Sequence, residues 1–399
     1  MRTTLGGHDD VPGFAAAYRE QSERFPGPPA GWQPVHTVYV PAGAFGPGTA
    51  REWGDAALVL LERHLPAASL AEVFGLPRDL AADIRDRVAR KLAAEPVEDL
   101  RVDFEDGYGV RPDAEEDAHA VAAAESVAAA HGDGTLPRRW GPRVKSFADG
   151  DPGRSLRTLD LFLTGVVDRA GGLPPGFTVT FPKVLMEAYL RQFADRLAAI
   201  EAGLALGGGA LRFEMQVEAP QTVLFLQRSP DLVASLGGRL AAAHFGVFDY
   251  TAACGLPPAE QRLDHPVCDH AREVMRTTLA GTGVELSDGS LAAAPASDAT
   301  ADVHALWRAH ATTVRHSLRN GFHQGWDMHP SHLVSRYATV YAFHLATYAP
   351  YAARVAAWQA RSEAGGGVLD EPATVKTLTA ALHRAESALD GTEPDDTGL

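Results

Sequence analysis

Two short apolar segments of this chain each end in a carboxylate. The segment 211–218 ends in Glu218, and Asp249 directly follows the segment 240–248. Apolar runs of this length, closed by proline or small polar residues, predict buried β-strands. Because parallel strands present their carboxyl ends at one edge of a sheet, we expect the two carboxylates to lie close together. Adjacent carboxylates need a positive partner, and the residue types favour a hard cation such as Mg²⁺ (or Mn²⁺).

Three acidic residues surround the end of another predicted strand, at 100–105. Two-residue alternation places Asp103 and Glu105 on one face, and Asp106 lies in the turn that follows. In a folded site these carboxylates repel one another unless a metal ion, its waters or cationic side chains offset them. A solvated acidic loop would give the same pattern, so this motif alone leaves both interpretations open.

Cationic residues lie on the next two predicted strands, at 142–147 and 177–183. Arg143 and Lys145 share one face of the first strand, and Lys183 ends the second. A cation at the mouth of a barrel suits a carboxylate or a developing enolate oxygen, and arginine binds such groups bidentately. A surface arginine and an ordinary salt bridge are the alternative interpretations.

Glu214 lies four residues before Glu218, so two-residue alternation places both side chains on one face of their strand. It is expected either to support the metal ligands or to pair inside a barrel with Arg212 or Lys183. The residue types do not decide between these roles.

Two histidines and an acid lie where the strand predicted at 324–329 gives way to a helix. The acid is Asp327 and the histidines are His329 and His332, with Ser331 as a suitable N-cap. Their spacing differs from the i, i+4 pattern of zinc proteases. We therefore favour a structural turn at the edge of a ligand site over a second metal centre.

Strand-like and helix-like segments alternate along most of the chain. Alternating β and α units predict a parallel sheet, and eight of them predict a (β/α)₈ TIM barrel. Besides those already given, strands are expected at 36–41 and 284–286, and helices at 78–94, 114–130, 154–169, 185–206, 221–236, 267–280 and 302–319.

Segments outside these eight units are expected at both ends of the chain. A short helix near 15–24 precedes the barrel, and a long helix at 333–361, broken or kinked near Pro350, follows it before a last helix at 373–389. We predict three parts: an N-terminal arm (1–35), a TIM-barrel catalytic domain (36–345) and a C-terminal helical extension or lid (346–399).

Composition narrows the class of protein. The 399 residues are 45% apolar, which suffices for a full core, and the net charge of −15 argues against a nucleic-acid partner. Two cysteines make no disulfide framework. The first residues lack a signal-peptide core, and no uncharged apolar run approaches the ~20 residues of a membrane span. We expect a cytoplasmic protein that binds neither nucleic acid nor membranes.

Eight short motifs, taken in order, resemble the superfamily of the citrate lyase β-subunit, malyl-CoA lyase and malate synthase, a metal-dependent group similar to class II aldolases. They lie at 39–43, 103–106, 143–144, 181–184, 217–220, 246–252, 328–331 and 368–372. The likeness spans roughly residues 36 to 389, and the motifs fall at the predicted strand ends. This chain departs from the family pattern at Lys145, where the family has Asn, and at Gly107-Tyr108-Gly109. It also has no recognisable set of CoA-binding residues.

The resemblance implies a role for each matching residue around the metal. Glu218 and Asp249 would bind Mg²⁺, and Arg143 would hold the carbonyl or enolate oxygen of the substrate. Glu105 and Asp106 would orient metal-bound waters or a neighbouring lysine.

The lysine that Glu105 and Asp106 would orient is Lys183. The resemblance also implies that Asp370 is the general acid/base. In several relatives this group comes from a neighbouring subunit, so a homo-oligomer (a trimer or hexamer) is expected. The glycines 365–367 would then be the hinge of a lid.

The expected function is that of a metal-dependent carbon–carbon lyase or aldolase. It would cleave or condense a 2-oxo acid or hydroxyacyl substrate through a metal-stabilised enolate, with a small oxo acid or an acyl-CoA as the partner. A Claisen-type synthase or acyl-CoA thioesterase with the same site is the alternative among enzymes. A catalytically silent metabolite-binding barrel is the alternative outside them.

Overall fold

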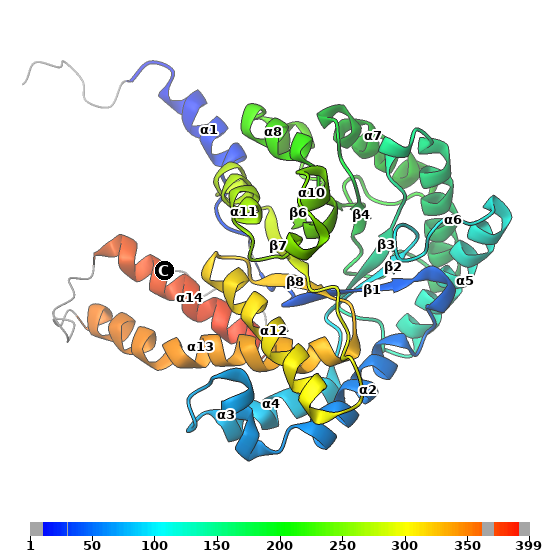
Figure 1. Ribbon diagram of the computed structural model, residues 1–399. Coiled ribbons are helices and arrows are strands. Elements are labelled where there is room, and N and C mark those ends of the chain that lie inside the picture. Colours follow the sequence, from blue (N-terminus) through cyan, green and yellow to red (C-terminus); the bar gives the residue numbers. More distant parts are fainter. Residues whose placement is uncertain (1–10, 30, 361–370, 391–399) are drawn as a thin grey trace, which may run out of the picture.

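Eight parallel strands close into a barrel in the computed structural model of the protein, which describes residues 11–29, 31–360 and 371–390 (Figure 1). Each strand pairs with its neighbours in the chain, and β8 pairs with β1. The predicted TIM barrel with an N-terminal segment and C-terminal helices is therefore confirmed. The strands are β1 (His36–Pro41), β2 (Asp99–Asp103), β3 (Arg139–Arg143), β4 (Val179–Phe181), β5 (Phe213–Val217), β6 (Leu240–Phe245), β7 (Glu285–Ser290) and β8 (Gln324–Asp327).

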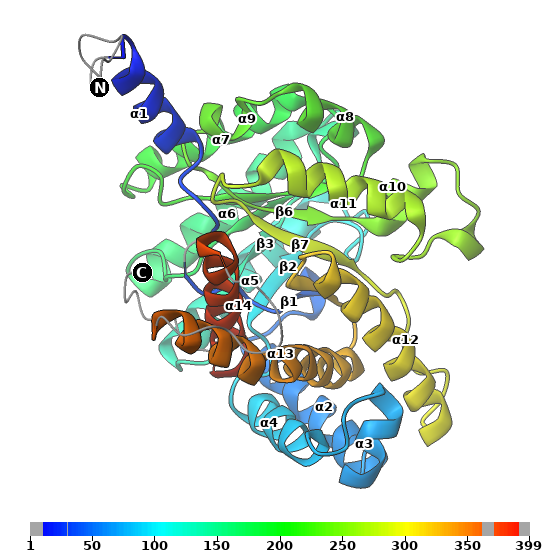
Figure 2. The ribbon, with the colours of Figure 1, turned by 90° about the vertical axis from the view of Figure 1, so that its left-hand side faces the viewer.

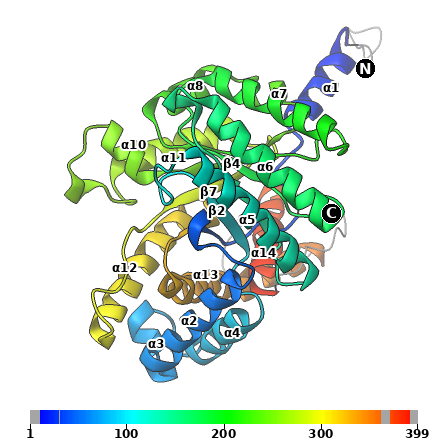
Figure 3. The same ribbon diagram turned by 90° about the vertical axis from the view of Figure 1, so that its right-hand side faces the viewer.

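Helices cover the outer face of the barrel. Outward residues of the strands such as Val38, Val102 and Val179 are fully buried beneath them, because each helix turns an apolar stripe inward. Figure 3 shows α5 and α6 side by side over the strands that they connect. The outer helices are α2 (Thr49–His64), α3 (Ala67–Phe74), α4 (Ala81–Ala94), α5 (Asp113–Gly132), α6 (Pro152–Ala170), α7 (Glu187–Gly203), α8 (Pro220–Arg228), α9 (Leu232–Ser235), α10 (Val247–Ala253), α11 (Pro266–Leu279), α12 (Thr300–Arg319) and α13 (Pro330–Gln359).

The connection from β1 to β2 contains three helices, of which we predicted only α4. The helical pattern of α2 is hard to recognise in the sequence, because Gly54 lies in the interior of the helix and glycine disfavours a helix. The packing explains this glycine: a Cβ at Gly54 would lie 2.6 Å from Cγ of Pro96. The missing side chain lets α2 pack closely against the segment that leads into β2.

Prolines divide the helices differently from the prediction. The single helix expected at 221–236 is two, α8 and α9, separated at Pro230, whose ring cannot continue the first. A break or a kink is expected at Pro350, and α13 runs through this residue without a break. Ala346, one turn earlier, lies on the same exposed side, so water can reach the carbonyl that Pro350 leaves without a donor. At the start of α13 the cap is His329 rather than Ser331, since its ring accepts the Ser331 N–H.

The last helix, α14 (Pro372–Asp390), packs along α13, and Ala388 near its end joins the main hydrophobic core (Figures 1 and 2). A small apolar cluster joins Val355 of α13 to Val375, Leu378 and Leu382 of α14. At about 1.5 Å of rise per residue, Val355 lies about 37 Å along α13 from Pro330, the first residue of the helix after β8. The start of α14 is therefore remote from the carboxyl ends of the strands. Asp370 and the glycines 365–367 lie outside the described residues.

The N-terminal helix, α1 (Phe14–Arg24), projects from the molecule, and none of its residues is buried (Figure 2). Its last residue, Arg24, forms an ion pair with Asp231 beside α9, with 2.7 Å between the charged atoms. Within the described residues, no helix is long and apolar enough to cross a membrane.

Candidate active site

The acidic and basic residues predicted on separate strands meet around one ammonium group. Nζ of Lys183 lies 2.7 Å from Oδ2 of Asp106 and 3.4 Å from Oδ2 of Asp249, and it also forms an ion pair with Glu105. The backbone N–H of Lys183 donates to Oε1 of Glu218 at 2.6 Å. These residues follow β2, β4, β5 and β6, so the cluster lies at the carboxyl ends of the strands, where TIM barrels carry their active sites.

Asp249 reaches this cluster from a helix. We predicted that it ends a strand, but β6 stops at Phe245 and Asp249 lies in the first turn of α10. The turn between them requires Gly246, because a Cβ there would lie 2.5 Å from Cβ of Glu218. The close approach keeps the two candidate metal ligands on adjacent elements at the mouth of the barrel.

Arg143 is buried and held in one orientation by two acids. Its Nε and Nη2 donate to the carboxylate of Asp103 at 2.7 and 2.6 Å, and its Nη1 lies 3.2 Å from Oε2 of Glu105. Burial alone would lower the pKa of Arg143, but the Asp103 carboxylate outweighs it, and the pKa is well above the usual value. The guanidinium therefore stays charged, and two of its five N–H donors remain for a ligand.

Two aromatic rings that we did not predict complete this wall. The guanidinium of Arg143 lies 4.8 Å from the ring centre of Tyr39 and 5.9 Å from that of Trp326, and the two rings are 4.6 Å apart. Strand alternation was the available signal, since Tyr39 on β1 and Trp326 on β8 both occupy inward positions. The rings exclude water from one side of the charged group.

Negative charge exceeds positive charge at this mouth. Burial raises the pKa of Glu218 to about 8; Lys183 and Arg143 oppose this, whereas the Glu105 and Asp249 carboxylates add to it. Five carboxylates meet two cationic side chains here: Asp103, Glu105, Asp106, Glu218 and Asp249 against Arg143 and Lys183. A divalent cation fits this set, because it would offset the excess charge and favour the ionised form of Glu218.

Lys183 remains an ammonium ion. Burial alone would lower its pKa, but the carboxylates of Glu105 and Glu218 outweigh it and raise the pKa above the usual value. A charged amine is no nucleophile, which speaks against a Schiff base at this lysine. Its backbone is also strained, since φ is 47°, a value that residues other than glycine rarely adopt. The hydrogen bond to Glu218 holds this conformation, which is typical of functional sites.

The raised pKa of Glu218 predicts how stability depends on pH. Between pH 4.5, its ordinary value, and about pH 8, the folded protein keeps a proton that the unfolded chain has released. The stability contributed by this group is therefore present below pH 4.5 and lost as the pH rises to about 8. Glu218→Gln keeps the acceptor for the Lys183 N–H, so its free energy of unfolding relative to wild type should rise by a few kcal/mol from pH 5 to pH 8. Urea denaturation in EDTA measures this, and an equal difference at both pH values would contradict the assignment.

Lys145 lies outside the cluster at the barrel mouth, unlike the prediction. Lys145 does not share the face of Arg143, because β3 ends at Arg143; its Nζ donates to Oε2 of the buried Glu116 on α5 at 2.6 Å. Lys145 therefore adds no unpaired charge at the mouth of the barrel.

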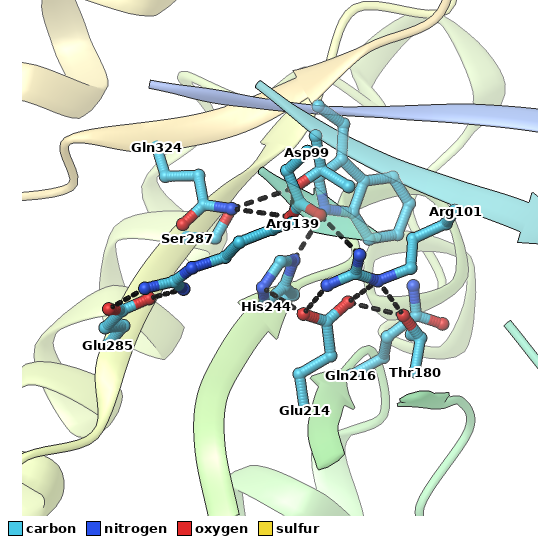
Figure 4. Close-up of polar contacts among 12 residues, drawn as sticks. Asp99, Arg101, Arg139, Thr180, Glu214, Gln216, His244, Glu285, Ser287 and Gln324 are labelled. Atoms are coloured by element: carbon cyan, nitrogen blue, oxygen red, sulfur yellow. Dashed lines mark hydrogen bonds and ion pairs between the residues drawn. The ribbon is translucent and has the colours of Figure 1, made fainter. Parts of the chain in front are cut away.

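Glu214 pairs with neither Arg212 nor Lys183. It lies deeper in the barrel, where Nη2 of Arg101 donates to its Oε2 at 2.7 Å and Nε2 of His244 lies 3.1 Å from the same oxygen (Figure 4). Trp326 in turn donates its indole N–H to Nδ1 of His244 at 3.3 Å. This network therefore supports the aromatic wall of the site from below.

Among the described residues, one group of histidines and acids has its ligand atoms close enough together to hold a metal ion. It consists of His310, Asp327 and His332, all buried. Both ring nitrogens of His332 already bond to backbone groups, and Arg336 donates to Asp327 at 2.8 Å. Because these ligand atoms already have partners, we interpret the group as a structural network, in agreement with the predicted structural turn.

Fold and site together define a (β/α)₈ barrel protein with a carboxylate-rich mouth. The chain belongs to the family described as "Domain of unknown function (DUF6986)", which it matches over residues 14–398. Among curated proteins, none matches it in sequence.

Solved structures share this fold. A lead(II) complex of malate synthase from Haloferax volcanii is 15% identical, with 90% of this chain and 80% of that chain covered and a TM-score of 0.52. The native enzyme at 3 mM glyoxylate is 13% identical, with 89% and 97% covered and a TM-score of 0.51. CitE from Mycobacterium tuberculosis, in complex with magnesium, acetoacetate and coenzyme A, is 18% identical, with 89% and 98% covered and a TM-score of 0.47. At these identities the two malate synthase structures, with TM-scores above 0.5, show a common fold.

Proposed function

We propose that this protein is a Mg²⁺- or Mn²⁺-dependent carbon–carbon lyase or aldolase that acts on a 2-oxo acid or hydroxyacyl substrate through an enolate. The observation that carries the proposal is the charge balance at the barrel mouth. Buried Glu218 accepts the backbone N–H of Lys183, and half-exposed Asp249 pairs with the ammonium group of the same residue, within a set of carboxylates that outnumbers its cations. A site that bound only a neutral metabolite would gain nothing from this arrangement.

Glu218 and Asp249 would hold the metal ion, which when bound acts as a Lewis acid toward a substrate carbonyl. Arg143 would direct its two remaining N–H donors at the oxygen where negative charge develops. Asp103 fixes the guanidinium through Nε and Nη2, so the donors need no reorientation during the reaction.

Lys183 would change partners when a cation enters. Its contact with Asp249 is its longest, at 3.4 Å, whereas Asp106 at 2.7 Å and Glu105 hold it on the other side. The ammonium group would remain with these two acids, which keeps it beside the site as a fixed positive charge. Asp370 would donate or accept the proton at the substrate carbon.

Glyoxylate is a reasonable first substrate to test. The malate synthase of Haloferax volcanii, which shares the fold, was described in the presence of this small 2-oxo acid. A cation and an arginine side by side suit both oxygens of such a compound. We also propose a homo-oligomer, since the start of α14 lies far from the mouth of its own barrel.

A Mg²⁺-dependent assay tests the proposal. Purified protein is incubated with candidate aldols and hydroxyacyl thioesters, and the release of pyruvate or glyoxylate is followed with Mg²⁺, with Mn²⁺ and with EDTA. We expect turnover that EDTA abolishes and added metal restores. Release of free CoA without carbon–carbon cleavage would instead indicate a thioesterase. Binding without turnover under all conditions would indicate a silent metabolite-binding barrel.

A further inference from the structure

A cavity of about 540 Å³ lies at the end of the barrel opposite the candidate active site. Residues at the amino ends of the strands line it, among them Arg139, Phe177, Arg212 and Glu285. Because TIM-barrel chemistry occurs at the carboxyl ends, the proposed reaction does not use this cavity.

A proline-rich segment before β1 forms one wall of the cavity, with Pro26, Pro28 and Pro29 among the lining residues. Hydrogen bonds tie it to the barrel: Gly27 donates to the carbonyl of Gly281 at 2.9 Å, and Gly283 donates to the carbonyl of Gly27 at 3.1 Å. Proline restricts the backbone and has no N–H of its own. The wall is therefore preformed and largely apolar.

The acid of this cavity already has a partner. Arg139 pairs with Glu285 through both ends of its guanidinium, with 2.7 Å between Nη2 and Oε1 (Figure 4). The same Nη2 donates to the carbonyl of Trp32 at 3.0 Å. Arg139 and Glu285 thus neutralise each other at the edge of the interior polar network.

Arg212 has no such partner. Its one hydrogen bond runs from Nε to the carbonyl of Gly238 at 3.3 Å, and among the described residues no carboxylate lies within ion-pair distance. Burial lowers the pKa of Arg212, Glu285 opposes this, and the charge of Arg139 lowers it further. The Arg212 side chain is exposed, so an anion can reach a guanidinium that no carboxylate neutralises. The cavity thus carries one excess positive charge in a chain of net charge −15.

We propose that this cavity is a binding site for a small oxyanion, a carboxylate or a phosphate, held by the terminal nitrogens of Arg212. The planar fork of arginine matches two oxygens of such a group. The apolar surface of the prolines and Phe177 would contact the rest of an organic ligand. One excess charge suits one such anionic group.

Calorimetry on metal-free protein in EDTA tests this site. Without metal, no metal-dependent binding can occur at the opposite end of the barrel. The probes are inorganic phosphate and propionate, which distinguish the two oxyanion classes, with chloride as a simple-ion control. We expect wild type to bind at least one probe with a Kd in the millimolar range or below, and chloride much more weakly. Arg212→Gln should weaken that binding at least tenfold.

Arg262→Gln is the matched control, since Arg262 is a 56% exposed arginine paired with surface acids. It makes the same change in net charge and should leave the affinity unaltered. If Arg212→Gln folds poorly, Arg212→Lys keeps the charge and loses the fork, and it should still weaken binding severalfold. Wild type that binds neither oxyanion, or an Arg212→Gln variant with unchanged affinity, would overturn the proposal. Neither outcome bears on the proposed lyase activity.

Discussion

Asp249→Ala is expected to abolish Mg²⁺ binding and to lower turnover roughly a thousandfold or more, because a catalytic metal supplies several kcal/mol of transition-state stabilisation. The fold should survive the change. Asp249 is 43% exposed, and its one ion pair with Lys183 spans 3.4 Å, so its loss costs little stability. Calorimetric titration with Mg²⁺ and Mn²⁺ measures the first effect, and the initial rate of oxo-acid release measures the second.

Asp195→Ala is a suitable control for this experiment. Asp195 is an exposed acid on α7, on the outside of the barrel, and its removal makes the same change in net charge. Its Mg²⁺ affinity and rate should equal those of wild type. Asp249→Asn keeps the size of the side chain and should fail as Asp249→Ala does. If either Asp249 variant retained the wild-type affinity for Mg²⁺, Asp249 would not be a metal ligand.

Mixed oligomers are expected to show that Asp370 acts on a neighbouring subunit. In the sequence, Asp370 is followed by Glu371 and then by α14. The start of α14 lies beside the far end of α13, about 37 Å along that helix from Pro330. Asp370→Asn and Glu218→Gln should each lower turnover by a factor of about a hundred or more. After subunit exchange at equal concentrations, about a quarter of the sites would combine an intact barrel with an intact neighbour. The mixture should therefore recover about a quarter of the wild-type rate.

A second mixture provides the control. Glu218→Gln and Asp249→Ala both change residues at the mouth of one barrel, so no exchange between these two variants can restore an intact metal site. That mixture should stay inactive. Absence of recovery in the first mixture, with subunit exchange verified by mass spectrometry, would mean that Asp370 serves its own barrel or none.

The barrel and the residues at its mouth follow from local patterns in the sequence. Eight apolar segments alternate with amphipathic helical ones, and parallel strands joined by helices bring all carboxyl ends to one edge. Any residue at such an end lies at the mouth, whatever its exact neighbours. For this reason Glu105, Arg143, Lys183 and Glu218 could be assigned to one site without knowledge of the contacts between them.

Which groups face each other depends on how the strands and helices pack. Period-two alternation gives the face on which Glu214 lies, but the tilt and stagger of the strands set its partners, which are Arg101 and His244 from β2 and β6. Asp249 lies on a helix because Gly246 allows the chain to turn against Glu218.

The same holds for contacts between distant segments. The cavity at the amino ends forms where residues 26–29 lie against the barrel, and the length of unbroken α13 carries the start of α14 away from the mouth. The surroundings of Glu218 and Asp249 also depend on contacts between distant segments. The sequence placed two acids at strand ends, whereas the packing surrounded them with further carboxylates and buried one of them. The chemistry of such a site depends on burial and on charges from several strands, which no local pattern of residues encodes.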